Sequence, residues 1–183
     1  EEGRRVFAYD FATNLVPGIE GINSYWRDIG TLEAYYDAAM DLTAPVPQLD
    51  LSNQQWPVHR NAVGGPPSRM LCGGSENSRI VRTVAGTGNQ FLGCTVIGSV
   101  LSRNIQILDE SLVEGSILMD DAVIGPGCRV RRAILDKNVV LPPGTEVGYN
   151  ASADRERGWH VTETGITVIS KEPATKPITT LDL

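Results

Sequence analysis

Apolar side chains recur at intervals of five or six residues through the middle of the chain. The series runs through Val96, Leu101, Ile107, Val113, Met119, Ile124, Val130, Leu135, Leu141 and Val147. A second set of mostly small or aliphatic residues follows many of these by four positions, with Gly or Asn between the two sets. A six-residue period is typical of a parallel β-helix, in which each hexad forms one short strand and one tight corner. Three hexads close a coil of about eighteen residues, so this stretch predicts roughly three coils.

A β-sandwich of short strands is the alternative for a stretch so rich in Val, Ile and Leu. Sandwich strands alternate with period two and carry turn signals about every 8–12 residues, and the hexads fit the sequence better. β-Helices of this kind are usually left-handed, as an exception to the right-handed crossover rule. We therefore expect a mainly β protein with a left-handed parallel β-helix over residues 80–170. The open ends of a short β-helix need covering, which favours a partner subunit or another domain.

A different period marks residues 24–42, "SYWRDIGTLEAYYDAAMDL". Its apolar residues follow the i, i+3, i+4, i+7 spacing of one buried helical face, at Leu32, Tyr35, Tyr36 and Ala39. Thr31 is a suitable N-cap, and Glu33 lies favourably in the first turn. Pro45, just after the pattern, is a typical stop signal. The sequence thus predicts one helix, which follows a strand-like start at residues 6–9.

Composition divides the rest of the chain. Residues 61–79 are rich in Gly, Pro and Ser and are predicted to be a linker between residues 1–60 and the hexads. Residues 171–183 form a Pro- and Thr-rich tail that we expect to be loosely ordered.

Charge and residue counts exclude several classes of protein. The net charge of −6 argues against nucleic-acid binding, and no apolar run approaches the ~20 residues of a membrane span. Cys72, Cys94 and Cys128 are scattered and form no C-x-x-C motif, which fits a reducing cytoplasm. The two histidines, His59 and His160, lie outside the hexads. Hexad enzymes with three zinc-binding histidines are therefore excluded, and hexad acyltransferases with a histidine base are disfavoured.

Asp28 is a candidate ligand for a divalent cation. It follows Trp26 and Arg27 and precedes the predicted helix. Divalent cations such as Mg²⁺ bind carboxylate oxygens and often share them with substrate phosphates. The alternative is structural, with Asp28 pairing with Arg27 or capping the helix, and the local pattern favours it.

Basic residues gather in "CRVRRAILDKNVV", at Arg129, Arg131, Arg132 and Lys137. Converging guanidinium groups suit a phosphate because their planar forks bind it with two hydrogen bonds. The alternative is a solvated face with ion pairs to Asp120, Asp121 or Asp136. The sequence pattern alone does not choose between the two.

These segments together resemble one family. "YWRDIGTLEAYYDAAMDL" is similar to the segment that ends the catalytic domain of bacterial ADP-glucose pyrophosphorylases, also called glucose-1-phosphate adenylyltransferases. The similarity continues in order through "WPV", "PPSR", "SVLSRNIQI", "VEGSILM", "RRAILDKNVVLPPGTEVG" and "GITVISKE". "RRAILDKNVV" is the most specific of these stretches, and the resemblance covers nearly the whole chain.

The resemblance implies the function of a complete enzyme. Such an enzyme joins ATP and glucose 1-phosphate into ADP-glucose and pyrophosphate, with Mg²⁺, for glycogen synthesis. It has a Rossmann-like catalytic domain, of which residues 1–60 would be the C-terminal remnant, and a left-handed β-helix domain. It is a cytoplasmic homotetramer that an anionic metabolite regulates.

The resemblance also implies roles for individual residues. Asp28 matches an aspartate that holds the catalytic Mg²⁺ together with a second aspartate far upstream. Trp26 and Arg27 match the sugar-phosphate side of the pocket. Four basic residues match or neighbour effector-binding positions, namely Lys137, Lys171, Arg129 and Arg132.

The family's Gly-rich phosphate loop, its substrate lysine and its first metal aspartate have no counterpart in these 183 residues. The chain also begins "EEGRRVF", without Met, as a piece of a longer protein would. We therefore expect this chain alone not to catalyse. Two alternatives stay open: a non-enzymatic regulatory or scaffold subunit, and the C-terminal part of another sugar-phosphate nucleotidyltransferase.

Overall fold

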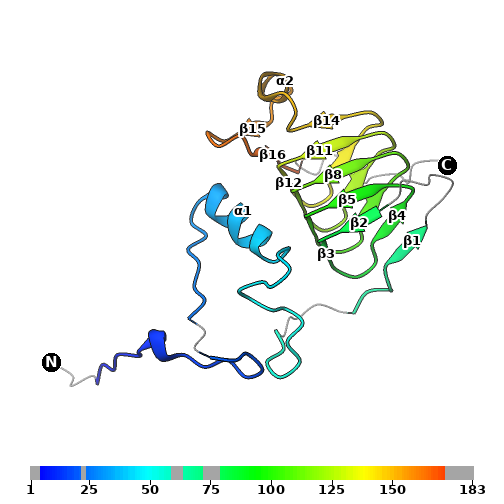
Figure 1. The fold of residues 1–183 in the computed structure, drawn as a ribbon. Coiled ribbons are helices and arrows are strands. Elements are labelled where there is room, and N and C mark those ends of the chain that lie inside the picture. The colour runs from blue at the N-terminus through cyan, green and yellow to red at the C-terminus, as the bar shows by residue number, and fades with distance from the viewer. Residues whose placement is uncertain (1–4, 22–23, 59–63, 72–78, 172–183) are drawn as a thin grey trace.

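Three parallel β-sheets form the three faces of a prism (Figure 1) in the computed structural model, which describes residues 5–21, 24–58, 64–71 and 79–171. The first face contains β1 (Arg69–Leu71), β4 (Gln90–Leu92), β7 (Gln106–Ile107), β10 (Val123–Ile124) and β13 (Val140–Leu141). The second contains β2 (Arg79–Val81), β5 (Thr95–Ile97), β8 (Leu112–Glu114), β11 (Arg129–Arg131) and β14 (Glu146–Val147). The third contains β3 (Val84–Ala85), β6 (Val100–Leu101), β9 (Ile117–Leu118), β12 (Ala133–Leu135) and β16 (Thr167–Ile169), with β15 (His160–Val161) antiparallel at its edge. The predicted parallel β-helix is confirmed.

The strand register sets the length of a coil. Val96 pairs with Val113, Val113 with Val130 and Val130 with Val147, so each of these coils has 17 residues. The expected length of about eighteen residues is therefore one residue too long. The difference arises because one side of the coil uses a five-residue step, as between Val96 and Leu101.

The interior of the prism is filled by the predicted apolar series, with one exception. The side chains of that series are buried, together with Cys94 and Cys128, which are free thiols in the core. The exception is Met119, which is only half-buried, while Leu118 points inward with no exposed surface. Leu118 pairs with Leu101 below and Leu135 above, which places it in the inward column.

The corners of the prism need backbone with positive φ. One corner has φ values of 46°, 54°, 47° and 48° at Arg82, Gly98, Gly115 and Arg132 in successive coils. Glycine adopts this left-handed conformation without a steric penalty, whereas a side chain with a Cβ costs about 1–2 kcal/mol. The corner is thus formed by glycine in the two middle coils and by arginine in the first and last.

The β-helix begins earlier than the sequence predicted. β1 lies inside the expected linker and pairs in register with β4, so residues 69–71 already belong to the first face. Residues 72–78 of that linker and residues 172–183 of the tail lie outside the described residues. At the other end, helix α2 (Ala151–Glu156) and β15 interrupt the coil before β16 continues the third face on β12. This detour covers the C-terminal end of the prism.

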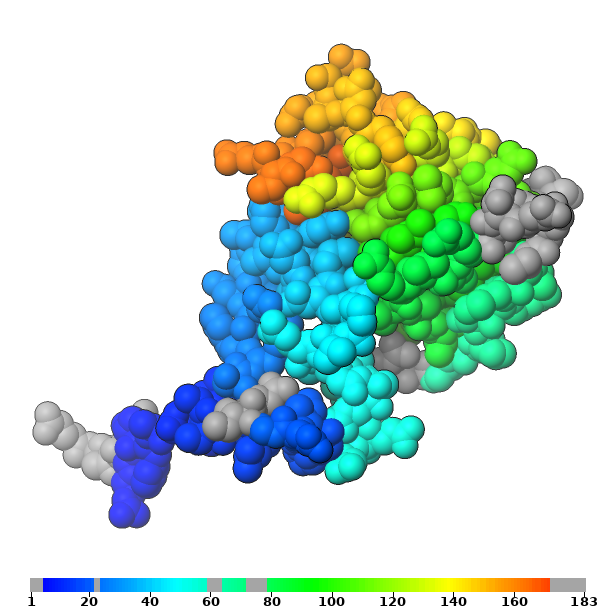
Figure 2. Space-filling view, viewed as in Figure 1, coloured from blue at the N-terminus to red at the C-terminus, as the bar shows by residue number. Residues whose placement is uncertain are grey.

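Helix α1 (Leu32–Asp41) lies against the outer side of the third face (Figure 2). Tyr36, which is buried, packs on Ile117, Ile134 and Ile166, and a half-buried Met119 joins them. Thr31 caps the helix as predicted, because its hydroxyl accepts from the amide of Ala34 at 3.1 Å. The inward face of α1 is therefore bound to the β-helix.

The segment before α1 has little regular structure. It holds one short 3₁₀ helix, η1 (Phe11–Thr13). The strand predicted at residues 6–9 does not form, and Val6 and Phe7 are 92% and 80% exposed. An isolated strand is unstable in water, and no described strand lies beside this one. Among the described residues, no helix has the length and apolar character needed to cross a membrane.

Candidate functional site

Asp28 lies in the short segment that leads into α1. Its Oδ1 accepts a hydrogen bond from the amide of Gly30 at 3.0 Å, and its side chain is exposed. No described residue forms a hydrogen bond with Oδ2. The turn leaves one carboxylate oxygen facing solvent, where it could bind a cation. The helix cap itself is Thr31, so the alternative in which Asp28 caps α1 is wrong.

Arg27 does not pair with Asp28. Its Nη2 lies 2.5 Å from Oδ2 of Asp41 at the end of α1, and its guanidinium lies 5.9 Å from the ring centroid of Tyr25. The hydrogen bond and charge of Asp41 raise the pKa of Arg27. Trp26 is 70% exposed. Trp26, Arg27 and Asp28 therefore share one exposed segment, and its fold comes from Asp41 and the Gly30 turn.

Metal ligands are few in the part of the chain that the structure describes. No group of three or more His, Cys, Asp or Glu side chains there could hold a metal ion. A single exposed carboxylate suits Mg²⁺ as one ligand among several, since this ion keeps waters and substrate phosphates in its shell. Asp28 fits the role of one protein ligand, and the remaining ligands must come from elsewhere.

Lys137 and Lys171 are brought together although they lie far apart in the sequence. The Asp136 carboxylate accepts from the backbone amide of Lys137 at 2.7 Å and from that of Lys171 at 3.4 Å. The amide of Asp136 in turn donates to the carbonyl of Ile169 at 2.9 Å. Both lysine side chains are exposed beside this knot. Two positive charges thus share one corner of the prism.

Arg129 lies on another part of the prism. It forms an ion pair with Glu146 at 3.0 Å, and its guanidinium stacks on Tyr149 at 4.4 Å from the ring centroid. Arg131 stacks on the same ring at 4.7 Å. Asp120, Asp121 and Asp136, the expected acidic partners, bind other groups. The ion pair is therefore present, but its partner is Glu146.

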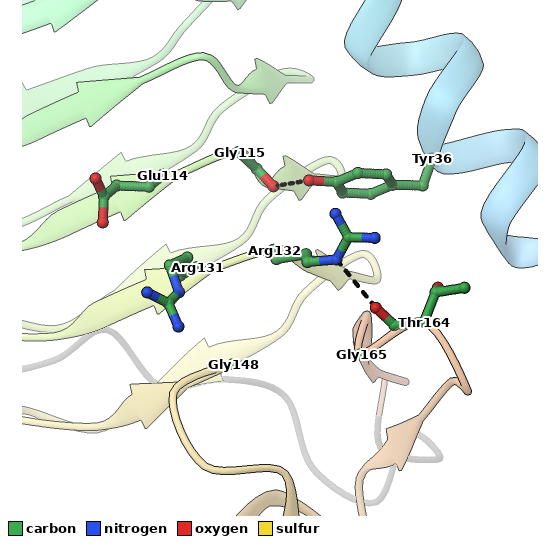
Figure 3. A pocket seen from close by; sticks show the side chains of 8 residues that line it. All are labelled: Tyr36, Glu114, Gly115, Arg131, Arg132, Gly148, Thr164 and Gly165. Carbon is green, nitrogen blue, oxygen red and sulfur yellow. Dashed lines mark hydrogen bonds between the residues drawn. The ribbon is translucent and has the colours of Figure 1, made fainter.

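Arg132 lies where α1 meets the β-helix, beside a groove of about 490 Å³ (Figure 3). Its guanidinium carbon is 5.4 Å from the centroid of the Tyr36 ring, and its Nε donates to the carbonyl of Thr164 at 3.3 Å. The Tyr36 hydroxyl donates to the carbonyl of Gly115 at 2.5 Å. Burial raises the pKa of Tyr36, while the charge of Arg132 acts in the opposite direction.

The four basic residues proposed for an effector therefore do not form one cluster. Arg129 and Arg132 lie on or beside β11, and Lys137 follows the next strand, β12. Sequence analysis took Tyr36 only as a helix core residue and did not connect it to Arg132. No local pattern signals that contact, because the hydrogen bond from Tyr36 joins residues 79 positions apart.

Comparisons with known proteins agree with this architecture. The family model described as "GlmU-like, C-terminal hexapeptide" matches residues 66–169. Glucose-1-phosphate adenylyltransferase of Deinococcus radiodurans is 42% identical over 172 residues, which is 93% of this chain and 41% of the relative. The enzymes of that name from Thermus thermophilus and Geobacter metallireducens are 47% and 41% identical, over 93% and 91% of this chain and 41% of each relative.

The chain spans about two fifths of the length of these curated relatives. The similarity falls on their C-terminal portion, as the resemblance predicted. The family model covers the β-helix from the start of its first face to β16. The chain therefore belongs to the GlmU-like C-terminal hexapeptide family.

Proposed function

We propose that this chain is the C-terminal part of a glucose-1-phosphate adenylyltransferase, which joins ATP and glucose 1-phosphate into ADP-glucose and pyrophosphate. The observation that carries the proposal is the 42% identity to an enzyme of that name over 93% of the chain. The similarity includes the Asp28 segment as well as the β-helix, so it extends beyond the hexads. Another sugar-phosphate nucleotidyltransferase would share the hexads but not the whole of this similarity.

In this proposal Asp28 is one ligand of a catalytic Mg²⁺. Nucleotidyl transfer needs little covalent help from the protein, since catalysis comes mainly from positioning and from neutralising phosphate charge. A bound Mg²⁺ would neutralise charge on the phosphates. The chain's own contribution is a carboxylate held by the Gly30 amide, with Trp26 and Arg27 beside it on the sugar-phosphate side.

Lys137 and Lys171 are proposed to bind an anionic effector. Their shared anchor on Asp136 supports this proposal, because it holds the two backbones close together while the side chains stay exposed. Two ammonium groups at one corner attract a phosphorylated metabolite. Arg129 is a weaker candidate since Glu146 already neutralises its charge, and Arg132 is occupied by Tyr36 and Thr164. A cytoplasmic homo-oligomer is part of the same proposal.

Substitution in the complete enzyme that carries this chain tests the metal role. Asp28→Asn should reduce turnover by at least about a hundredfold with the fold intact, because it removes a charged metal ligand. Asp37→Asn, at an exposed position on α1, is the matched control and should leave turnover unchanged. Normal turnover in the Asp28 variant would remove the metal role.

The effector role has its own test. Lys137→Ala and Lys171→Ala should weaken activation by a phosphorylated effector more than they lower the basal rate. Arg155→Ala is the control, since Arg155 is an exposed cation on α2, away from Asp136. An unaltered activation curve in both lysine variants would refute the assignment. The isolated 183-residue chain should make no ADP-glucose, and a measurable rate would contradict that expectation.

A further inference from the structure

The contact between α1 and the β-helix joins the segment that carries Asp28 to the prism. We propose that Tyr36 and Arg132 are positioning residues that fix the Asp28 carboxylate relative to the β-helix. The inference rests on the proposed function for the role of Asp28 itself. The contact, however, can be tested without any activity.

Helix α1 depends on this contact for its order. It has only 10 residues, and isolated helices shorter than about 12–15 residues are marginal in water. Its apolar face packs on the small cluster around Ile117, Ile134 and Ile166, which is separate from the core of the prism. Polar contacts at the same place then fix its orientation.

Three hydrogen bonds and a stacked cation form a clasp, which we define as Tyr36, Gly115, Arg132, Thr164 and Glu33. The Tyr36 hydroxyl is bound to Gly115, and Arg132 covers the Tyr36 ring while its Nε binds Thr164. Thr164 Oγ1 donates to the Glu33 carboxylate at 3.4 Å, in the first turn of α1. Figure 3 shows Arg132 between the Tyr36 ring and the Thr164 carbonyl. The clasp therefore holds the N-terminal half of α1.

The N-terminal half of α1 is also the end nearest to Asp28. Asp28 binds the amide of Gly30, and Thr31 caps the helix through Ala34. These two local turns leave few free rotations between the carboxylate and the first turn of α1. A movement of α1 on the prism must therefore move Asp28, and a displaced ligand weakens metal binding.

Arg132 has a matched control in the same fold. Arg82 occupies the same corner in the first coil, with φ 46° against 48° for Arg132. Both arginines therefore carry the same backbone strain. They differ in their surroundings, because Arg132 stacks on Tyr36, while no ring contact involves Arg82 among the described residues.

Hydrogen exchange of the 183-residue chain tests the clasp. Tyr36→Phe and Arg132→Gln should speed exchange of the α1 amides about tenfold, the effect expected for one lost hydrogen bond or cation contact. Exchange within strands β5, β8 and β11 should not change. Arg132→Lys should restore part of the protection, and Arg82→Gln should behave as the unsubstituted chain. Unchanged α1 exchange in both clasp variants would overturn the proposal.

The complete enzyme tests the consequence for Asp28. Arg132→Gln should raise the Mg²⁺ concentration for half-maximal rate about tenfold while the rate at saturating Mg²⁺ changes less than about twofold. A purely structural role would lower stability without shifting the Mg²⁺ requirement. If Asp28→Asn is inactive and Arg132→Gln keeps the normal Mg²⁺ requirement, the positioning role is wrong. If Asp28→Asn is fully active, the proposed metal role fails, while the exchange result still decides whether the clasp exists.

Discussion

Leu118 gives a direct test of the inward column of the β-helix. It has no exposed surface and is stacked in register between Leu101 and Leu135. Met119, the next residue, is half-buried against α1 instead. The two residues are adjacent and similar in size, so alanine substitutions at both compare an interior position with a lateral one.

The expected magnitudes differ several-fold. Leu118→Ala removes three carbon atoms from the interior, a transfer term of about 2.4 kcal/mol at ~0.8 kcal/mol per carbon. The strands above and below are held by ladder hydrogen bonds, so the cavity cannot collapse, and the total should reach about 4 kcal/mol. Met119→Ala loses contacts on a partly solvated surface and should cost about 1 kcal/mol.

Urea unfolding followed by circular dichroism at two wavelengths provides the measurement. Coincident transitions are required for both variants, because a stacked repeat can unfold in parts. A Met119→Ala variant as destabilised as Leu118→Ala would refute the assignment of the inward column. It would mean that Met119, as the hexad count alone suggests, points into the prism.

Two further predictions concern buried or paired carboxylates. Asp154 is 1% exposed and accepts from the Gly148 amide and the Thr167 hydroxyl, each at 2.8 Å, so Asp154→Ala should destabilise the chain by about 3 kcal/mol in the same urea assay, and Asp154→Asn by less. Arg103 and Ser102 hold the pKa of Asp120 well below its usual range. That lowered pKa stabilises the fold above about pH 4, where the unfolded carboxyl is also ionised, and the contribution is lost as the pH falls further. Thermal unfolding between pH 5 and pH 2, compared with Asp120→Asn, should show a smaller acid-induced loss in the variant, and an equal loss in both proteins would contradict the assignment.

The architecture was predictable because it repeats. Each inward residue is confirmed by a counterpart one coil away, so a few ambiguous positions do not change the pattern. Met119 was misassigned because hexad spacing allows steps of five and six residues, and Leu118 and Met119 are both apolar. A 17-residue step from Leu101, or back from Leu135, selects Leu118, but that step is visible only once the coil length is known.

The candidate site was less predictable, since its contacts are not local. Arg129, Arg132 and Lys137 are close in sequence, and the chain passes from β11 through β12 toward β13 along them, so they belong to different parts of the prism. Lys137 and Lys171 meet only because β16 adds to the third face after the detour through α2. The role of Asp28 came from the family resemblance and stays a prediction, because its turn with Gly30 is compatible with either a structural or a metal-binding role.

The constant coil length makes the prism a yardstick for the clasp. Gly115 and Arg132 occupy the same corner one coil apart, a rise of about 4.8 Å along the axis, and Tyr36 bridges that step. Adding or removing a whole 17-residue coil below β8 would leave both rungs, and therefore α1, in register with the C-terminal cap. An extra coil between β12 and β16 would instead lift Thr164 out of reach of Arg132. Proteins of this kind are thus free to vary in length on one side of α1 only.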